Sequence, residues 1–170
     1  MEKWDLFNEK RQLIHKTHNR QDEMKLGEYH IVVEIWTINS KNEILLTLRH
    51  PDKEKYPNFW ENTAGSVLSG EGSKTGAVRE LYEETGIRAS ENELQLLGTA
   101  KEKTAFVDTY IVRKDYDISE LTMQEGETSK AQWVSLDELD RMINLGIIAP
   151  PVARRFSLLR EKLEEFLFNS

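Results

Sequence analysis

Three glutamates near the middle of the chain, Glu80, Glu83 and Glu84, have a spacing that suits metal chemistry. Residues 73–85 are predicted to form a helix, because Gly86 follows at the position where helices commonly end in a glycine. Residues three and four positions apart lie on one side of a helix, so the three carboxylates share one edge of its last turns. Hard oxygen ligands of this kind suit Mg²⁺ or Mn²⁺.

This arrangement is unfavourable for a helix without a further charge. Like charges four residues apart repel by about a few tenths of a kcal/mol per pair, and the C-terminal end of a helix already carries negative partial charge. Arg79 is expected to offset only one of the carboxylates. A bound cation would remove the conflict. The plainer alternative is a solvated acidic face, which is common in a chain of net charge −7.

The residues around this helix follow an order that resembles the signature of the Nudix hydrolase family. Gly65 is followed after five residues by Glu71, and after seven more by Arg79-Glu80-Leu81. One further residue precedes Glu83-Glu84, and another precedes Gly86-Ile87. The resemblance over residues 65–87 matches every defining position of the signature.

The resemblance implies a role for each charged residue of the segment. Glu80, Glu83 and Glu84 would bind one or more divalent cations that grip a diphosphate, and a metal-activated water would attack phosphorus. Glu83 and Glu84 would be the main ligands, whereas Glu80 would be a ligand or the base that deprotonates the water. Arg79, in the catalytic segment, and Glu71 are expected to pair and to orient the site.

The resemblance also points to ligands outside the helix. The backbone carbonyl near Gly65 is a further ligand in many family members, although many of them have a second glycine where this chain has Ala64. Family members often add a glutamate from a downstream loop, and Glu127 stands where it would fall, with Glu125 close enough to compete. A solvated acidic loop is the alternative for both.

Three residues are candidates for substrate binding. Arg49 and Lys53 lie at and beyond the end of a predicted strand, where they could meet substrate phosphates. Trp60 could stack on a base, although an aromatic residue beside a strand more often packs into the core.

Composition restricts the classes of protein to which the chain can belong. Its 170 residues, 38% hydrophobic and 31% charged, predict one globular domain over residues 1–170. The chain contains no cysteine, which excludes disulfides, thiolate zinc sites and cysteine nucleophiles. The acidic balance argues against nonspecific binding to nucleic acid or anionic membranes. The partner that the Nudix resemblance implies is a small-molecule diphosphate. No apolar run approaches about 18 residues and the N-terminus lacks an apolar signal segment, so a cytoplasmic protein is expected. A homodimer is left open.

The pattern of apolar residues predicts strands with only a few helices, which is typical of α+β or mixed α/β folds. Strands are expected at residues 4–7, 12–16, 31–38, 44–49, 94–103, 105–112 and 131–134, and a further one up to residue 65. Residues 31–38 and 44–49 are expected to form a hairpin. Residues 94–103 and 105–112, after the central helix, are expected to form a second antiparallel pair. Residues 17–27 and 115–130 are expected to be irregular. Further helices are expected from about 135 to 145 and over residues 152–168, after a break at Pro150-Pro151.

The Nudix resemblance implies an α/β/α sandwich with a mixed sheet, preceded by an N-terminal hairpin over about residues 1–27. Stretches outside the signature are similar to the branch of the superfamily that includes isopentenyl diphosphate isomerase, namely residues 5–9 (DLFNE), 27–30 (GEYH) and 60–63 (WENT). His18 and His30 fall near the metal-binding histidines of that isomerase. Its catalytic cysteine is replaced by Ala64, so these histidines are expected to be ordinary turn and strand residues.

The sequence therefore predicts divalent-metal-dependent hydrolysis of a diphosphate linkage in a nucleoside diphosphate derivative or a similar small molecule. The alternatives are an isomerase-like protein and a non-catalytic Nudix module that binds a ligand.

Overall fold

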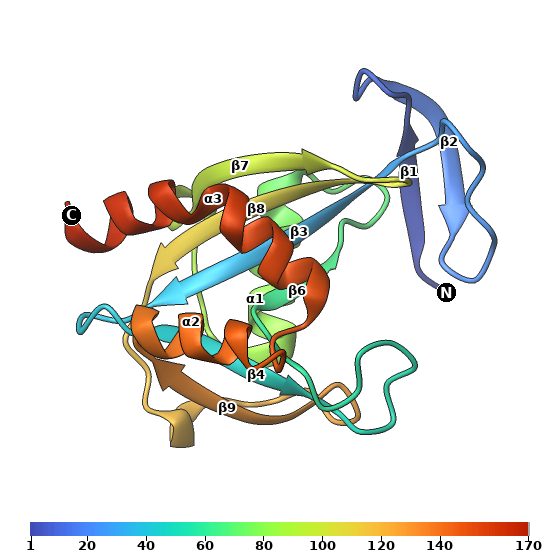
Figure 1. The fold of residues 1–170 in the computed structure, drawn as a ribbon. Helices are drawn as coiled ribbons and strands as arrows, with labels where there is room; N and C mark the ends of the chain where they lie inside the picture. The colour runs from blue at the N-terminus through green and yellow to red at the C-terminus, as the bar shows by residue number, and fades with distance from the viewer. Residues whose placement is uncertain (170) are drawn as a thin grey trace.

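A mixed seven-stranded sheet lies at the centre of the structure, a computed structural model that describes residues 1–169 (Figure 1). Its strands are β3 (His30–Ile38), β4 (Ile44–Arg49), β5 (Trp60–Glu61), β6 (Thr63–Ser66), β7 (Gln95–Lys101), β8 (Ala105–Arg113) and β9 (Thr128–Val134). The order is β5-β4-β3-β8-β7, with β6 paired to β3 and β9 paired to β4. Strands β3 and β8 run parallel along their whole length, and the other pairs are antiparallel. The sheet is therefore mixed, as predicted.

Helices cover both faces of this sheet. Helix α1 (Ser73–Thr85) buries Ala77 and Leu81 in a core on one face, among strand residues such as Val33 and Ile35. Helices α2 (Leu136–Asn144) and α3 (Pro150–Phe168) pack on the opposite face (Figure 1). There Phe156 contacts the ring of Trp36, which is fully buried. Alternation of side chains along the strands supplies both cores. The predicted α/β/α sandwich is confirmed. No helix within residues 1–169 has the length and apolar character needed to cross a membrane.

Several predicted boundaries are wrong, and the reasons lie in pairing between distant strands. The predicted hairpin of β3 and β4 is present, but it is short. Only Ile38 and Ile44 are in register, because β6 pairs with β3 and β9 pairs with β4. The strand expected up to residue 65 is two short strands separated by Asn62. The region expected to be irregular after residue 115 contains a 3₁₀ turn, Ile118–Glu120, and strand β9 already begins at Thr128.

The two prolines near the C-terminus begin a helix instead of marking a break. Pro150 and Pro151 occupy the first two positions of α3. A proline is tolerated there because the first N–H groups of a helix have no partner within it.

The N-terminal hairpin forms a separate two-stranded sheet beside the central one (Figure 1). Its strands are β1 (Lys3–Phe7) and β2 (Leu13–Asn19), so the prediction that residues 17–27 are irregular is wrong for residues 17–19. Phe7 extends the pairing to Tyr29 through two backbone hydrogen bonds of 2.8 and 2.9 Å.

A buried aspartate ties this hairpin to the rest of the fold. Asp108 of β8 receives two hydrogen bonds from the Arg11 guanidinium, at 2.6 and 2.5 Å. The hydroxyls of Ser73, at the start of α1, and Thr99 of β7 donate to the same carboxylate at 2.5 and 2.6 Å. The Arg11 side chain and these hydroxyls lower the pKa of Asp108 against the effect of its burial, which raises it. One carboxylate of β8 therefore joins the N-terminal hairpin, α1 and β7 to this strand.

Replacement of Asp108 by alanine is expected to destabilise the protein by about 2–3 kcal/mol, because it leaves Arg11 and two hydroxyls without their acceptor. Urea denaturation measures this loss, and faster tryptic cleavage within residues 8–27 would show that the hairpin has detached. Glu138→Ala is the control, since the pair of Glu138 with Arg141 is exposed to solvent and should contribute little to stability. Equal losses in the two variants would contradict the anchoring role of Asp108.

Candidate active site

Helix α1 has the bounds that the sequence predicts and places its glutamates along one edge. The helix ends because Gly86 adopts a left-handed conformation, with φ of 75°, and its N–H donates to the Tyr82 carbonyl at 2.8 Å. Only glycine adopts this conformation at little cost. Leu81 on the neighbouring side of the helix is fully buried, so the helix cannot rotate without losing its core contacts.

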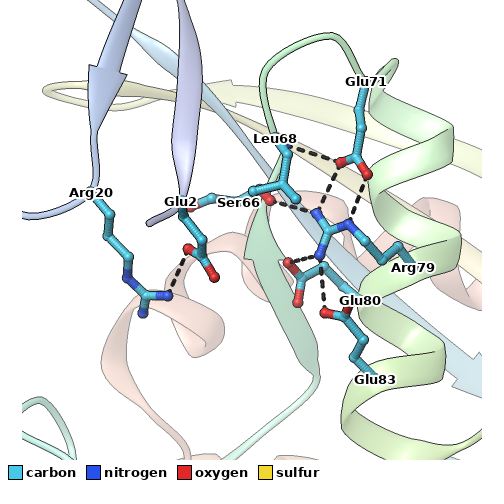
Figure 2. Close-up of polar contacts among 8 residues, drawn as sticks. All are labelled: Glu2, Arg20, Ser66, Leu68, Glu71, Arg79, Glu80 and Glu83. Atoms are coloured by element: carbon cyan, nitrogen blue, oxygen red, sulfur yellow. Dashed lines mark hydrogen bonds and ion pairs between the residues drawn. The ribbon is translucent and has the colours of Figure 1, made fainter.

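The guanidinium of Arg79 binds three carboxylates at once (Figure 2). It donates to both oxygens of Glu71, at 2.8 and 2.9 Å, to Glu80 at 2.7 Å and to Glu83 at 3.1 Å. A further donor reaches the Ser66 carbonyl at 2.9 Å. The predicted pairing of Arg79 with Glu71 is present. The expectation that Arg79 offsets only one carboxylate is wrong, because a planar guanidinium can direct five donors outward.

The helix glutamates line a cavity of about 230 Å³ together with residues from four other parts of the chain. Its acidic lining residues are Glu2, Glu61, Glu80, Glu83, Glu84 and Glu127, and its basic ones are Arg20, Arg49 and Lys53. The backbone segment 64–66 forms another wall, with Gln124 and Thr128 beside Glu127. Of the two candidate loop glutamates, Glu127 lines the cavity, and Glu125 is not among its lining residues.

Two of the predicted substrate-binding cations lie in the cavity wall, each paired with a glutamate. One terminal nitrogen of Arg49 donates to both carboxylate oxygens of Glu61 at 2.9 Å, and the Lys53 ammonium pairs with Glu127. The third candidate, Trp60, does not line the cavity. Its ring packs against the core under α2 and α3, the more common role for an aromatic residue beside a strand.

The carboxyl group of Glu84 has a pKa well above its ordinary value. Burial is the main cause, and the negative charges of Glu61, Glu80 and Glu127 add to it, whereas a hydrogen bond with the Ala64 backbone opposes it. Burial also raises the pKa of Glu80, against the lowering effect of Arg79. Both groups are therefore costly to ionise in the protein alone.

Gly65 is required by the position of the Glu80 carboxylate. A Cβ atom at residue 65 would lie 2.0 Å from Cδ of Glu80 and 2.3 and 2.4 Å from its two oxygens. Any other residue at this position would displace the carboxylate from the cavity wall.

The chemistry of these residues fits a divalent cation. No three histidine, aspartate or glutamate side chains within residues 1–169 are gathered closely enough to hold a metal as they stand. Arg79, Lys53 and Arg49 hold several of the cavity glutamates by hydrogen bonds or ion pairs. The like charges that raise the pKa of Glu84 nevertheless converge on one carboxylate, and a cation bound there would relieve their repulsion.

Among the charged lining residues, three were not predicted from the sequence, namely Glu2, Arg20 and Glu61. Glu61 had a local signal, since it is a charged residue directly before the segment that leads to Gly65. Glu2 and Arg20 had none, because only the pairing of β1 with β2 and the docking of this hairpin bring them to the cavity.

His18 and His30, which correspond roughly in sequence to metal-binding histidines of the isomerase, lie outside the cavity. Both stack on Trp4, with ring centroids 5.9 Å away for His18 and 4.0 Å for His30, and neither lines the cavity. Burial, with a contribution from His18, lowers the pKa of His30 to about 4.

The raised pKa of Glu84 predicts an unusual dependence of stability on pH. Between the ordinary pKa of the unfolded glutamate and the raised value, the folded protein binds more protons, so the free energy of unfolding falls as pH rises. In a chelating buffer, raising the pH from 5 to 8 should therefore destabilise the wild type by about 1 kcal/mol or more relative to Glu84→Gln. Thermal or urea unfolding at several pH values measures this difference. Glu161→Gln on α3 is the control, and parallel curves for wild type and Glu84→Gln would refute the interpretation.

Comparisons with known proteins identify the family of this chain. Residues 28–156 match the family model of the NUDIX domain. The chain is 37% identical over 151 residues to "Uncharacterized Nudix hydrolase lmo0368" of Listeria monocytogenes, over 88% of this chain and 89% of that protein. It is 30% identical over 135 residues to NAD-capped RNA hydrolase NudC of Haemophilus influenzae, over 73% of this chain and 50% of that protein.

A solved structure supports the fold. DR0079 from Deinococcus radiodurans superposes with a TM-score of 0.74 at 23% identity, over 91% of this chain and 98% of that one. The resemblance to the isomerase branch stays a prediction. The intact signature, the family match over most of the chain and the hydrolase relatives together show that the chain belongs to the Nudix hydrolases, enzymes that cleave phosphoric anhydrides and generally use a divalent metal.

Proposed function

We propose that this protein hydrolyses the diphosphate linkage of a nucleoside diphosphate derivative or a similar small molecule, with Mg²⁺ or Mn²⁺ as cofactor. The observation that carries the proposal is the cavity in which Glu80, Glu83, Glu84 and Glu127 lie together with cationic side chains. A divalent cation and an anionic phosphate require these two kinds of partner next to each other.

Each charged residue has a distinct role in this proposal. Glu83, Glu84 and Glu127 would hold the cation, which when bound would neutralise phosphate oxygens and lower the pKa of a water molecule. Glu80 would take the proton of the attacking water, a task that its raised pKa favours. Arg79 would keep Glu80 and Glu83 in position through its hydrogen bonds to both.

The reaction would add one water molecule across the anhydride. A water oxygen would attack one phosphorus atom, the bond between this phosphorus and the bridging oxygen would break, and two phosphorylated products would leave. Arg49 and Lys53 would bind substrate phosphates, as they already lie in the cavity wall.

Two observations support the substrate class. The NudC relative is named for hydrolysis of NAD-capped RNA, whose cap is a nucleoside diphosphate derivative. The net charge of −7 disfavours a long nucleic acid, so a free small molecule is the better candidate. The cytoplasmic location, the single domain and the homodimer remain predictions.

The test is release of phosphorylated products from a panel of diphosphates, measured with Mg²⁺ and with Mn²⁺. The panel contains NADH, ADP-ribose, nucleoside triphosphates, dinucleoside polyphosphates, coenzyme A and prenyl diphosphates. Turnover of at least one compound is expected, with a loss of about 100-fold or more in Glu83→Gln because a cation ligand is removed. Turnover that persists in a chelating buffer, or is unchanged in Glu83→Gln, would refute the proposal.

A matched pair of variants tests the contribution of the downstream loop. Glu127→Gln is expected to raise the metal concentration needed for half-maximal activity by about tenfold or more, because it removes one charged ligand. Glu125→Gln should leave this concentration unchanged, since Glu125 lies two residues away and does not line the cavity. Titration of each variant with metal measures this concentration. Equal effects in the two variants would show that Glu127 is not a ligand.

A further inference from the structure

The open end of the N-terminal hairpin forms part of the cavity wall. Glu2 precedes β1 and Arg20 follows β2, and the register that pairs Lys3 with Asn19 sets them opposite each other. The Arg20 N–H donates to the Glu2 carbonyl at 3.1 Å, and its guanidinium pairs with the Glu2 carboxylate at 2.8 Å (Figure 2). Both residues lie outside residues 28–156, the segment that matches the family model.

Contacts with the loop before α1 hold this end of the hairpin in place. The Asp5 carboxylate accepts hydrogen bonds from the Ser69 hydroxyl at 2.6 Å and from the Gly70 N–H at 2.9 Å. The Ser69 N–H donates to the Lys3 carbonyl at 2.8 Å. The hairpin and the glutamate helix are therefore attached to the same loop, in addition to their shared contacts with Asp108.

The negative charge of Glu2 affects a carboxylate of the site. Burial is the main cause of the raised pKa of Glu80, and the charges of Glu83 and Glu2 raise it further. Glu2 thus lies within electrostatic reach of a proposed catalytic carboxylate, in agreement with its place in the cavity lining.

Arg20 is the most accessible cation of the cavity. Its side chain is 59% exposed and its partner Glu2 is 46% exposed, whereas Arg49 and Glu61 are 17% and 16% exposed. Exposed ion pairs contribute little to stability, so little is lost when such a pair opens. A phosphate group accepts two parallel hydrogen bonds from a guanidinium and is a stronger partner than an exposed carboxylate.

We propose that Arg20 binds a phosphate group of the diphosphate substrate and that Glu2 holds its guanidinium at the cavity until the substrate arrives. The hairpin, which precedes the segment that matches the family model, is then a substrate-binding element. This inference rests on the proposed function, because it assigns a further phosphate contact to the same cavity.

The experiment measures binding of methylenediphosphonate, whose P–C–P bridge cannot be hydrolysed, in the presence of Mg²⁺ by isothermal titration calorimetry. Arg20→Ala is expected to weaken binding by about tenfold or more, which corresponds to the loss of a charged hydrogen bond. Arg20→Lys should recover part of the affinity, since it restores the charge without the paired donors. Glu2→Gln should tighten binding, because the amide oxygen can still accept a hydrogen bond from Arg20 while the competing negative charge is removed.

The control is Lys16→Ala on the same hairpin. Lys16 also pairs with a glutamate, Glu28 at 3.3 Å, and its side chain is 64% exposed, but it does not line the cavity. This variant should bind methylenediphosphonate as the wild type does. Thermal unfolding of each variant shows whether the hairpin remains docked.

The outcomes separate this inference from the proposed function. Weaker binding in Arg20→Ala but not in Lys16→Ala supports the inference even if no compound of the substrate panel is turned over. Equal affinities in these two variants, or no binding to the wild type, would overturn it. Turnover of the panel together with either of these results would leave the hydrolase proposal intact and remove only Arg20 from the site.

Discussion

The guanidinium of Arg79 is the interaction on which the arrangement of the site depends. Glu71, Glu80 and Glu83 would repel one another at the distances that the fold imposes, and one cation with five donors reaches all three and a backbone carbonyl as well. These contacts fix the loop, the end of β6 and helix α1 relative to each other. A lysine would supply the charge but not the planar set of donors.

The same compensation of charge recurs around the cavity. Arg49 lies with Glu61, and Lys53 lies with Glu127. For the hydrolase that we propose, a divalent cation that binds Glu127 would release Lys53, and the freed ammonium could then bind phosphate. Metal and substrate would each favour the binding of the other, because each takes one member of an existing pair. Paired charges in the cavity are thus consistent with a site that exchanges partners during the reaction.

The sequence predicted best the features that depend on neighbouring residues. Helix α1 was predicted with its true bounds because its apolar and charged residues repeat at helical spacing and Gly86 follows at the end. The long strands β3 and β8 are mostly apolar, and the family signature pointed to the glutamates. Contacts between distant segments could not be predicted in this way. The short strand β6 and the full length of β9 depend on partners far along the chain, and no local pattern encodes them.

In the candidate site too, some residues could be predicted from local sequence, whereas others are brought there only by contacts between distant segments. Gly65 and Glu80 were both predicted from the signature, but their relation is steric, since a Cβ at residue 65 would overlap the Glu80 carboxylate. Gly76 is a second case, as its Cβ would come within 3.0 Å of the Val67 side chain and 3.4 Å of a Glu71 oxygen. Gly65 is therefore required by the position of a signature glutamate, whereas Gly86 is required by its left-handed backbone. Glu2 has no such link to the signature, because it reaches the cavity only through the docking of the hairpin, which depends on the buried charge of Asp108 at the other end of β1 and β2.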